Sequence, residues 1–247
     1  MPRQARRKSE SGFYHILLRG IGQQNIFEDD EDNERFLQTL KRYQDDMKFE
    51  IHAYCLMGNH VHLVIKDIKD ELDLIIKKLA SSYAYYFNWK YERTGHVFQD
   101  RFKSEVVDDD SYYLALIRYI HQNPQKANIA LACKYRWSSY QEYINGEKIA
   151  TTRLALELLG GRDKFINYVN EFDTVDSFLD IQKKENLTDS KAIDIIKKKF
   201  KISNALSIST MPAEQRNKVI KKLKDEGLSV RQLSRLTGVN RGTVLRA

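Results

Sequence analysis

The apolar and polar positions divide the chain into two parts of different character. As far as about Trp137, strand-like stretches alternate with helical stripes in the order β-α-β-β-α-β-α. Such an order is typical of an antiparallel sheet with helices on one face, so a ferredoxin-like α+β fold is the expected architecture. The expected strands cover residues 13–20, 49–57, 60–67 and 96–107, and the expected helices cover 33–47, 72–89 and about 110–123.

Local signals define the ends of several of these elements. A glycine-asparagine pair at 58–59 favours a tight turn, so the second and third strands should form a hairpin. Asp110 or Ser111 can cap the third helix. That helix should end near Asn123, because Pro124 disfavours helical geometry in the residue that precedes it.

The rest of the chain shows almost only helical patterns, so we expect an all-α region over 146–247 after a first domain over 1–145. Near its end, Ser229 can cap one helix, Gly238 can make a turn and Asn240 can open a second helix. This spacing is typical of a helix-turn-helix module at about 211–247, although any helix pair with a short turn shares it. Shorter amphipathic helices are expected at 154–159, 164–172, 189–200 and 213–226.

Charge is unevenly distributed along the chain. The net charge is +7, of which residues 1–10 carry +3 and residues 211–247 carry +6, so residues 11–210 hold about −2. Basic segments at both ends of a near-neutral body suit a polyanionic partner, but tails that only increase solubility would give the same pattern. Four arginines on the outer faces of the last two expected helices favour DNA as that partner: Arg231, Arg235, Arg241 and Arg246.

Composition excludes several classes of protein. With 42% hydrophobic residues and only two cysteines, the chain is neither disordered nor a disulfide scaffold. Cys55 and Cys133 show no Cys-x-x-Cys spacing, which favours a reducing cytoplasm over a zinc ribbon or a redox pair. No apolar run approaches the ~18 residues of a membrane span, and the basic start lacks the apolar stretch of a signal peptide. We therefore expect a cytoplasmic, nucleoid-associated protein without a membrane partner.

Two histidines lie in the second arm of the expected hairpin. Because side chains alternate along a strand, His60 and His62 should project to one face while Val61 and Leu63 project to the other. Two neighbouring imidazoles suit one divalent metal, but a lone pair of this kind is more often half-buried without any ligand. A third ligand is needed to favour the metal site.

A tyrosine and an asparagine on the third expected helix supply that candidate. Tyr119 and Asn123 are four residues apart and so lie on one helical face. A phenol is a weak nucleophile at neutral pH and needs an activated phosphate, which a bound cation provides. Tyr112 and Tyr113 are rival nucleophiles, although Leu116 and Ile117 at their i+4 positions cannot bind a metal.

At these residues the sequence resembles a known family. The segments YHILLRG, YCLMGNHVHLVI, GHVFQDRFKS after YFN, RYIHQNPQKA and YRWSSY occur here in the order seen in transposases of the HUH class. That class is named for its His-hydrophobe-His motif. The sequence is most similar to the REP-associated tyrosine transposases and their insertion-sequence relatives, over about residues 12–142.

The resemblance implies an HUH nuclease domain that nicks and rejoins single-stranded, hairpin-flanked DNA through a 5′-phosphotyrosine intermediate. By the matching motifs, the catalytic tyrosine is Tyr119 and the metal ligands are His60, His62 and Asn123, with Mg²⁺ or Mn²⁺ as the cofactor. Zinc is the expected inhibitory occupant of such a ligand set. One departure is Gly58, where the family commonly has proline, and this should change the turn but not the chemistry.

Further DNA contacts are expected from basic and aromatic residues. Candidate phosphate contacts are Arg19, Arg101 and Lys103, and candidate duplex contacts in the C-terminal module are Arg235, Arg241 and Arg246. Tyr85, Tyr86, Phe87 and Trp89 offer rings for base stacking, but most of them should be core because they follow a helix stripe.

Two other functions stay open at this point. A catalytically inactive, transposase-derived DNA-binding regulator would keep the fold and lose the covalent step. A metal phosphoesterase would use the histidine pair and water, and it would form no protein-DNA adduct. The competent residue types at all four expected site positions argue against loss of catalysis. The sequence also leaves open whether the protein is a monomer or a homodimer.

Overall fold

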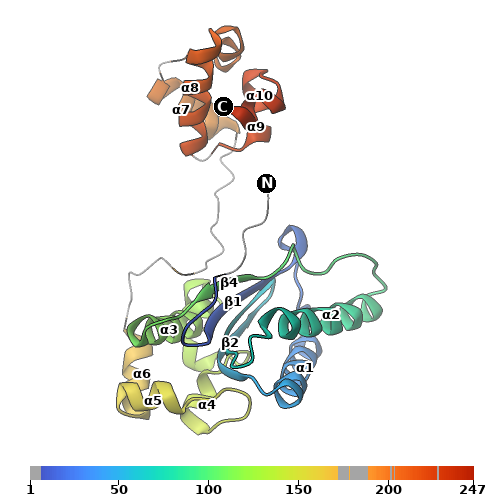
Figure 1. The fold of residues 1–247 in the computed structure, drawn as a ribbon, viewed down its shortest axis with the longest axis vertical. Helices are drawn as coiled ribbons and strands as arrows, with labels where there is room; N and C mark the ends of the chain where they lie inside the picture. The colour runs from blue at the N-terminus through green and yellow to red at the C-terminus, as the bar shows by residue number, and fades with distance from the viewer. Residues whose placement is uncertain (1–6, 172–177, 179–188, 201, 203, 227) are drawn as a thin grey trace. The chain divides into compact units, whose positions relative to one another are not determined.

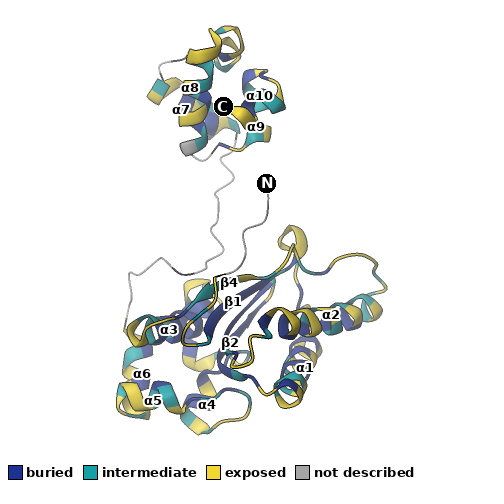
Figure 2. Ribbon diagram, viewed as in Figure 1, coloured by how far each residue is buried: buried dark blue, intermediate teal, exposed yellow. Residues whose placement is uncertain are grey.

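The computed structural model describes residues 7–171, 178, 189–200, 202, 204–226 and 228–247. The chain divides into two compact units, Met1–Asp180 and Ile181–Ala247 (Figure 1). Each unit has buried hydrophobic residues of its own (Figure 2). No helix in the described part of the chain is long and apolar enough to cross a lipid bilayer.

The first unit is built on a four-stranded antiparallel sheet of order β2-β3-β1-β4. The predicted order of elements and the hairpin at 58–59 are confirmed. The last strand is shorter than the expected 96–107, because the left-handed backbone of Asp100 interrupts it and Phe98 makes only an isolated bridge. The strands are Phe13–Arg19 (β1), Glu50–Met57 (β2), His60–Lys66 (β3) and Lys103–Val106 (β4).

Helices cover both faces of this sheet, so the expectation of helices on one face is wrong. Asp30–Met47 (α1) and Leu72–Lys90 (α2) lie on one face, and Asp110–Lys126 (α3) lies on the other (Figure 1). The central strands are buried on both sides, and alternate residues therefore belong to two different cores. Ile16 and Leu63 pack with α1 and α2, whereas Phe13 and Val64 pack with α3.

The helix ends depend on capping side chains next to the expected positions. Asp29 forms a capping box with Asp32, so α1 begins earlier than residue 33. The α3 cap is Asp109, whose side chain accepts from the Tyr112 backbone N–H, and not Asp110 or Ser111. This helix also continues through Pro124 to Lys126. The proline removes only the bond that its own N–H would have made, and the next turn still closes, with Ala127 N–H donating to Asn123 at 3.0 Å.

Three short helices that follow α3 belong to the first unit. They are Tyr140–Asn145 (α4), Arg153–Leu159 (α5) and Arg162–Asn170 (α6). Ala155 and Phe165 are buried in the same hydrophobic cluster as Ile117 and Ile120 of α3. The structure therefore divides the chain at residues 180 and 181, and not at the expected boundary after residue 145. The difference arises because α5 and α6 need α3 to bury their apolar sides.

The second unit is entirely helical in its described residues. The predicted cap at Ser229 and turn at Gly238 are present, and Asn240 caps the last helix, with its Oδ1 accepting from the Gly242 N–H. Ala192 and Ile196 of the first helix lie in the common core, so this unit begins before residue 211. The helices are Asp189–Phe200 (α7), Ala213–Asp225 (α8), Val230–Thr237 (α9) and Arg241–Arg246 (α10), with a 3₁₀ segment at Ala205–Thr210.

Candidate active site

The two histidines of the HUH motif share one face of β3. Val61 and Leu63 point into the core under α1 and α2, while the His62 ring contacts Tyr119 of α3. The ring centroids of His60 and His62 lie 5.0 Å apart. The predicted alternation along this strand is therefore confirmed, and it presents both imidazoles to the α3 side of the sheet.

His60 is held in one protonation form by its neighbour in the chain. Its Nδ1 lies 2.7 Å from Oδ1 of Asn59, and because an amide oxygen only accepts, Nδ1 carries the proton. The lone pair of a neutral His60 is therefore on Nε2. Burial, with a further contribution from the Arg19 charge, lowers the pKa of His60 to about 3, so the ring is neutral at physiological pH.

His62 is fully buried and keeps one ring nitrogen without a partner. Its Nδ1 lies 3.0 Å from Nε2 of His15, while Nε2 makes no hydrogen bond within the described residues. Burial, followed by the nearby His60 and His15, lowers the pKa of His62 well below its ordinary value. A buried nitrogen that lacks a partner is unfavourable in a protein interior unless a ligand or water completes it.

Tyr119 lies against these histidines and is 5% exposed. Its ring meets the His62 ring edge-on, with 5.6 Å between centroids, and the Phe178 ring at 4.8 Å. Lys126, two turns along α3, places its Nζ 5.0 Å from the centre of the Tyr119 ring. The side chain is thus enclosed by an imidazole, a phenyl ring and a cation.

The rival tyrosines lie elsewhere on α3. The Tyr113 hydroxyl is 2.8 Å from Nδ1 of His52, which is a buried contact away from the HUH pair. Tyr112 is half-buried, and its ring packs against Phe178 at 5.2 Å. Burial raises the pKa of both phenols. Of these three tyrosines, only Tyr119 has a ring contact with His62 in the described structure.

Asn123 follows Tyr119 by one helical turn and is buried. Its Nδ2 donates to the backbone carbonyl of Tyr119 at 3.1 Å. This bond uses the donor end of the amide and leaves Oδ1 as its acceptor end. An amide oxygen presented in this way is a suitable ligand for a hard divalent cation.

The donor types of His60, His62 and Asn123 fit a divalent metal. The neutral His60 ring has its lone pair on Nε2, the buried Nε2 of His62 has no hydrogen-bond partner among the described residues, and Asn123 has an amide oxygen one helical turn from Tyr119. In the described parts of the chain, no group of three or more His, Cys, Asp or Glu side chains is arranged to hold a metal. A metal site here therefore depends on the amide of Asn123 or on the substrate for its further oxygen ligands.

The expected phosphate contacts fall in two places. Arg19 pairs with His60 across β1 and β3, and its Nε is buried without a hydrogen bond among the described residues. Lys103 pairs with Leu17 on the same face of the sheet, and its side chain is exposed. Arg101 instead lines a pocket of about 560 Å³ beside α2. Leu18, which belongs to the core on the α1 and α2 side of the sheet, lines the same pocket. The structure thus brings Arg19 to the histidines and separates Arg101 from them.

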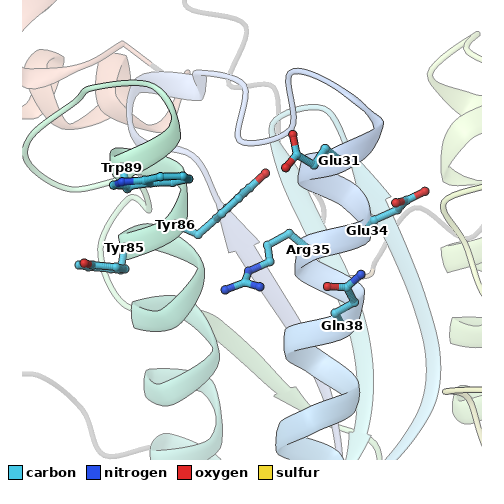
Figure 3. Close-up of a pocket in the computed structure, with 7 residues that line it drawn as sticks. All are labelled: Glu31, Glu34, Arg35, Gln38, Tyr85, Tyr86 and Trp89. Atoms are coloured by element: carbon cyan, nitrogen blue, oxygen red, sulfur yellow. The ribbon is translucent and has the colours of Figure 1, made fainter.

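The aromatic residues of α2 are only partly core. Tyr86 and Phe87 are buried, but Tyr85 and Trp89 are 78% and 73% exposed, so the expectation that most are core holds for only two of the four. Figure 3 shows Tyr86 pointing toward α1 and Tyr85 pointing away from it. Tyr85, Tyr86 and Trp89 line a pocket between α1 and α2 that Glu31 and Glu34 also line. Arg35 is the one basic residue of this lining, so its carboxylates are in excess and we assign no DNA contact to the pocket.

The three arginines predicted for the C-terminal module differ in their surroundings. Arg235 Nη2 lies 2.6 Å from Oδ1 of Asp189 in an exposed ion pair. Arg241 and Arg246 are exposed on α10, and no ion pair of theirs is present among the described residues. The two arginines of the last helix are therefore available to a partner, whereas Arg235 is already engaged within its own unit.

The basic N-terminal segment is described only in part. Arg3 and Arg6 lie outside the described residues. Arg7 forms an ion pair with Asp108 at 3.3 Å, and Lys8 forms one with Asp70. These two cations are neutralised by the domain itself, which reduces the share of the N-terminus in any attraction of a polyanion.

Sequence reasoning assigned no role to three residues that contact the site. The contact of Lys126 with Tyr119 could have been predicted, because the two residues are seven apart and lie on one face of a helix. It was missed because the helix was expected to end at Asn123. Asn59 was used only as a turn residue, although the adjacent histidine could have suggested the contact. His15 had no signal in the local sequence, because its contact with His62 depends on the pairing of β1 with β3.

The chain is similar to known proteins in sequence and in structure. Residues 8–123 match the family model described as "Transposase IS200 like". No curated protein matches the sequence. A solved structure of a REP-associated tyrosine transposase bound to a REP hairpin shows a TM-score of 0.47 at 16% identity, covering 62% of this chain and 92% of that chain. A Deinococcus radiodurans protein assigned as a transposase shows a TM-score of 0.35 at 14% identity, covering 53% of this chain and 99% of that chain.

Proposed function

Because residues 8–123 match the family model described as "Transposase IS200 like", we propose that the protein nicks and rejoins single-stranded DNA with Tyr119 as its nucleophile. The metal ligands in this proposal are His60, His62 and Asn123, and the substrate is a single strand flanked by a hairpin. Mg²⁺ or Mn²⁺ is the cofactor that suits the chemistry.

One observation carries the proposal. The only tyrosine of the three candidates on α3 that contacts the HUH pair is Tyr119, with its ring edge-on to His62 at 5.6 Å. A nucleophile for phosphoryl transfer has to lie beside the group that activates the phosphate. Tyr112 and Tyr113 lack such a contact and are engaged with Phe178 and His52 instead.

The reaction is an exchange of phosphodiester bonds. The Tyr119 hydroxyl oxygen attacks the scissile phosphorus and loses its proton, the bond from phosphorus to the 3′-oxygen breaks, and that oxygen leaves as a hydroxyl. The 5′-phosphate is then esterified to Tyr119, and attack by another 3′-hydroxyl reverses the step. A bound divalent cation would supply charge stabilisation on the non-bridging phosphate oxygens.

Other residues have supporting roles in this proposal. Arg19, beside His60, would bind a phosphate oxygen close to the site of attack. Lys126, over the Tyr119 ring, would stabilise negative charge that develops on the phenol oxygen. The lowered pKa values of the two HUH histidines keep both rings neutral, which ligation of a metal requires.

Denaturing electrophoresis tests the proposal. The protein is incubated with 3′-labelled single-stranded hairpin DNA and Mn²⁺, and wild type should give a labelled protein band. Tyr119→Phe should give none, because the substitution removes one oxygen and little packing area. Tyr112→Phe is the matched control on the same helix and should still give the band.

The same gel separates the alternatives. Cleaved DNA without a labelled protein band would indicate a phosphoesterase that uses water. Bound but uncleaved DNA would indicate a regulator without catalysis. A persistent band in Tyr119→Phe would show that another residue is the nucleophile.

We also propose that the second unit binds DNA through a helix-turn-helix made by α9 and α10. Support comes from its charge, since residues 181–247 hold sixteen Lys and Arg against six Asp and Glu. Further support comes from Arg241 and Arg246, which are exposed on the last helix. In such a module the second helix enters the major groove, so these two arginines would approach the base edges.

A further inference from the structure

A third histidine forms a buried pair with the HUH motif. His15 lies on β1, diagonally across from His62 on β3, and both side chains are fully buried. Nε2 of His15 and Nδ1 of His62 are 3.0 Å apart. The rings are stacked, with 5.3 Å between centroids and 22° between planes, and the His15 ring also meets Tyr119 edge-on at 6.2 Å.

The hydrogen bond between two neutral imidazoles permits only two proton arrangements. In the first, Nδ1–H of His62 donates to Nε2 of His15, and the lone pair of His62 is on Nε2. In the second, Nε2–H of His15 donates to Nδ1 of His62, so Nε2 of His62 carries a proton and cannot bind a metal. The same contact therefore either prepares His62 as a ligand or prevents it from acting as one.

The two HUH histidines differ in what determines the ring nitrogen that carries the proton. His60 is fixed by the Asn59 amide oxygen, which can only accept, so its Nε2 lone pair is permanent. Nδ1 of His62 instead contacts the His15 imidazole, whose Nε2 can either donate or accept. A group that orients a ligand histidine and sets its proton typically changes metal affinity by about 10- to 100-fold when it is removed.

We propose that His15 is a positioning residue that accepts the Nδ1–H of His62 and so holds Nε2 of His62 ready for the metal. This inference rests on the proposed metal site. It assigns His15 no contact with the metal or the DNA, because its action passes through His62.

The strand register places a carboxylate opposite His15, which carries a proton on Nδ1 in this arrangement, but the two groups are not hydrogen-bonded in the structure. A neutral His15 that accepts at Nε2 carries its proton on Nδ1, which is buried without a partner in the described structure. Glu105 pairs with His15 from β4, and its Oε2 is likewise buried without a hydrogen bond among the described residues. A carboxylate at this position can accept from Nδ1–H and stabilise the same arrangement.

Two substitutions of His15 separate this role from packing. His15→Phe keeps a planar ring in the core but removes the acceptor. His15→Gln places an amide oxygen near the position of Nε2 and restores it. Titration calorimetry of the full-length protein with Co²⁺, without DNA, measures the effect, because Co²⁺ binds imidazole more tightly than Mn²⁺ does. We expect Co²⁺ affinity to fall about 10- to 100-fold in His15→Phe and to recover largely in His15→Gln.

His52→Phe is the matched control. His52 is 2% exposed on β2 and is hydrogen-bonded to Tyr113 and Glu50, which are not part of the metal site. This variant should bind Co²⁺ as wild type does. An equal loss in His15→Phe and His52→Phe would mean that a damaged sheet, and not the His15 acceptor, causes the effect, and this would overturn the proposal.

Nuclear magnetic resonance of the ¹⁵N-labelled, metal-free protein gives an independent result. Long-range nitrogen-proton correlations identify the protonated ring nitrogen of His62, which should be Nδ1 in wild type and in His15→Gln. Protonation at Nε2 in wild type, or unchanged Co²⁺ affinity in His15→Phe, contradicts the role of His15 alone. Co²⁺ binding that survives His60→Ala with His62→Ala contradicts the metal site itself, so the two failures are distinguishable.

Discussion

The two units of the chain differ in both chemistry and charge. Residues 1–180 contain all six histidines, all fourteen tyrosines and both tryptophans, and carry 25 basic against 28 acidic residues. Residues 181–247 contain none of those three residue types and carry sixteen basic against six acidic residues. The groups that can perform covalent catalysis are therefore separated from the charge that can attract a polyanion.

The two units also differ in which side chains are buried. In the first unit, five histidines are buried, and burial lowers the pKa of each. In the second, the exposed side chains include Arg241 and Arg246, and the core is aliphatic. Packing in the first unit thus keeps its buried imidazoles neutral, whereas the packed core of the second unit leaves basic side chains exposed.

The largest expected effect concerns the chemistry of the first unit. His60→Ala with His62→Ala should reduce DNA cleavage by about 10³-fold or more, because transition-state charge on the phosphate would lose a cation worth several kcal/mol. Cleavage rates with Mn²⁺ measure this effect. His52→Ala is the control for the loss of a buried histidine. Undiminished cleavage in excess chelator would contradict the assignment.

Removal of the second unit should change binding without changing the chemistry. A chain that ends at Asp180 keeps its own hydrophobic cores, so it should still form the covalent adduct on a short single strand. Its affinity for duplex-containing DNA should fall, and the log-log salt slope should decrease by about 0.9 for each lost phosphate contact. Affinity measured at several salt concentrations gives both values.

The salt slope also tests a purely structural role for the second unit. If α7 to α10 only stabilised the first unit, truncation would lower its melting temperature and weaken all activities together. The slope would then be the same in both proteins. Equal slopes would therefore contradict DNA binding by residues 181–247.

Acid should destabilise the first unit selectively. His15, His60 and His121 have a pKa of about 3 in the folded protein against about 6.5 when unfolded, so below pH 6.5 the unfolded chain binds more protons. Each should cost about 1.4 kcal/mol of stability per pH unit as pH falls from 6.5 toward 5, and none of this loss occurs above 6.5. Both tryptophans report on this unit, so fluorescence-detected urea unfolding of the metal-free protein measures it.

The second unit is the internal control for the acid effect. It has no histidine and has a hydrophobic core of its own, so a separate chain of residues 181–247 should keep the same urea midpoint in circular dichroism between pH 7 and 5. A fluorescence midpoint that is equally insensitive to pH would mean that the histidines titrate normally. In that case they are not buried as the structure has them.

The smallest effect distinguishes the arginines of the C-terminal module. Arg241→Ala or Arg246→Ala should each weaken duplex binding by about 1–3 kcal/mol if they reach base edges. Arg235→Ala should have a smaller effect, because its exposed ion pair with Asp189 already occupies the guanidinium. Equal effects at all three positions would argue that the α9–α10 pair is not oriented as a helix-turn-helix. Fluorescence anisotropy with a labelled duplex measures the differences.

Local sequence signals predicted most elements and the central pair of the site. Alternation along β3 gave the common face of His60 and His62, and helical spacing gave that of Tyr119 and Asn123. Short-range signals also gave the turn at 58–59 and the cap at Ser229. These features depend on residues that are close in sequence, and for that reason they could be predicted.

The features that were missed depend on partners distant in sequence. The contact of His15 with His62 joins β1 to β3, and the association of α5 and α6 with α3 sets the unit boundary beyond residue 145. The helix end at Pro124 was wrong for another reason. A rule for the residue before proline gives a tendency, and burial of Asn123 and Pro124 in the domain offset it here.

Mapping of the covalent linkage tests the central claim most directly. Trypsin cleaves after Arg118 and after Lys126, so Tyr119 lies on a peptide of its own, apart from Tyr112 and Tyr113. The adduct formed with single-stranded DNA is purified, its DNA is digested to the linked nucleotide, and the peptides are analysed by tandem mass spectrometry. We predict the phosphonucleotide on Tyr119 in the peptide of residues 119–126. Modification within residues 104–118, or on any other residue, would contradict the account.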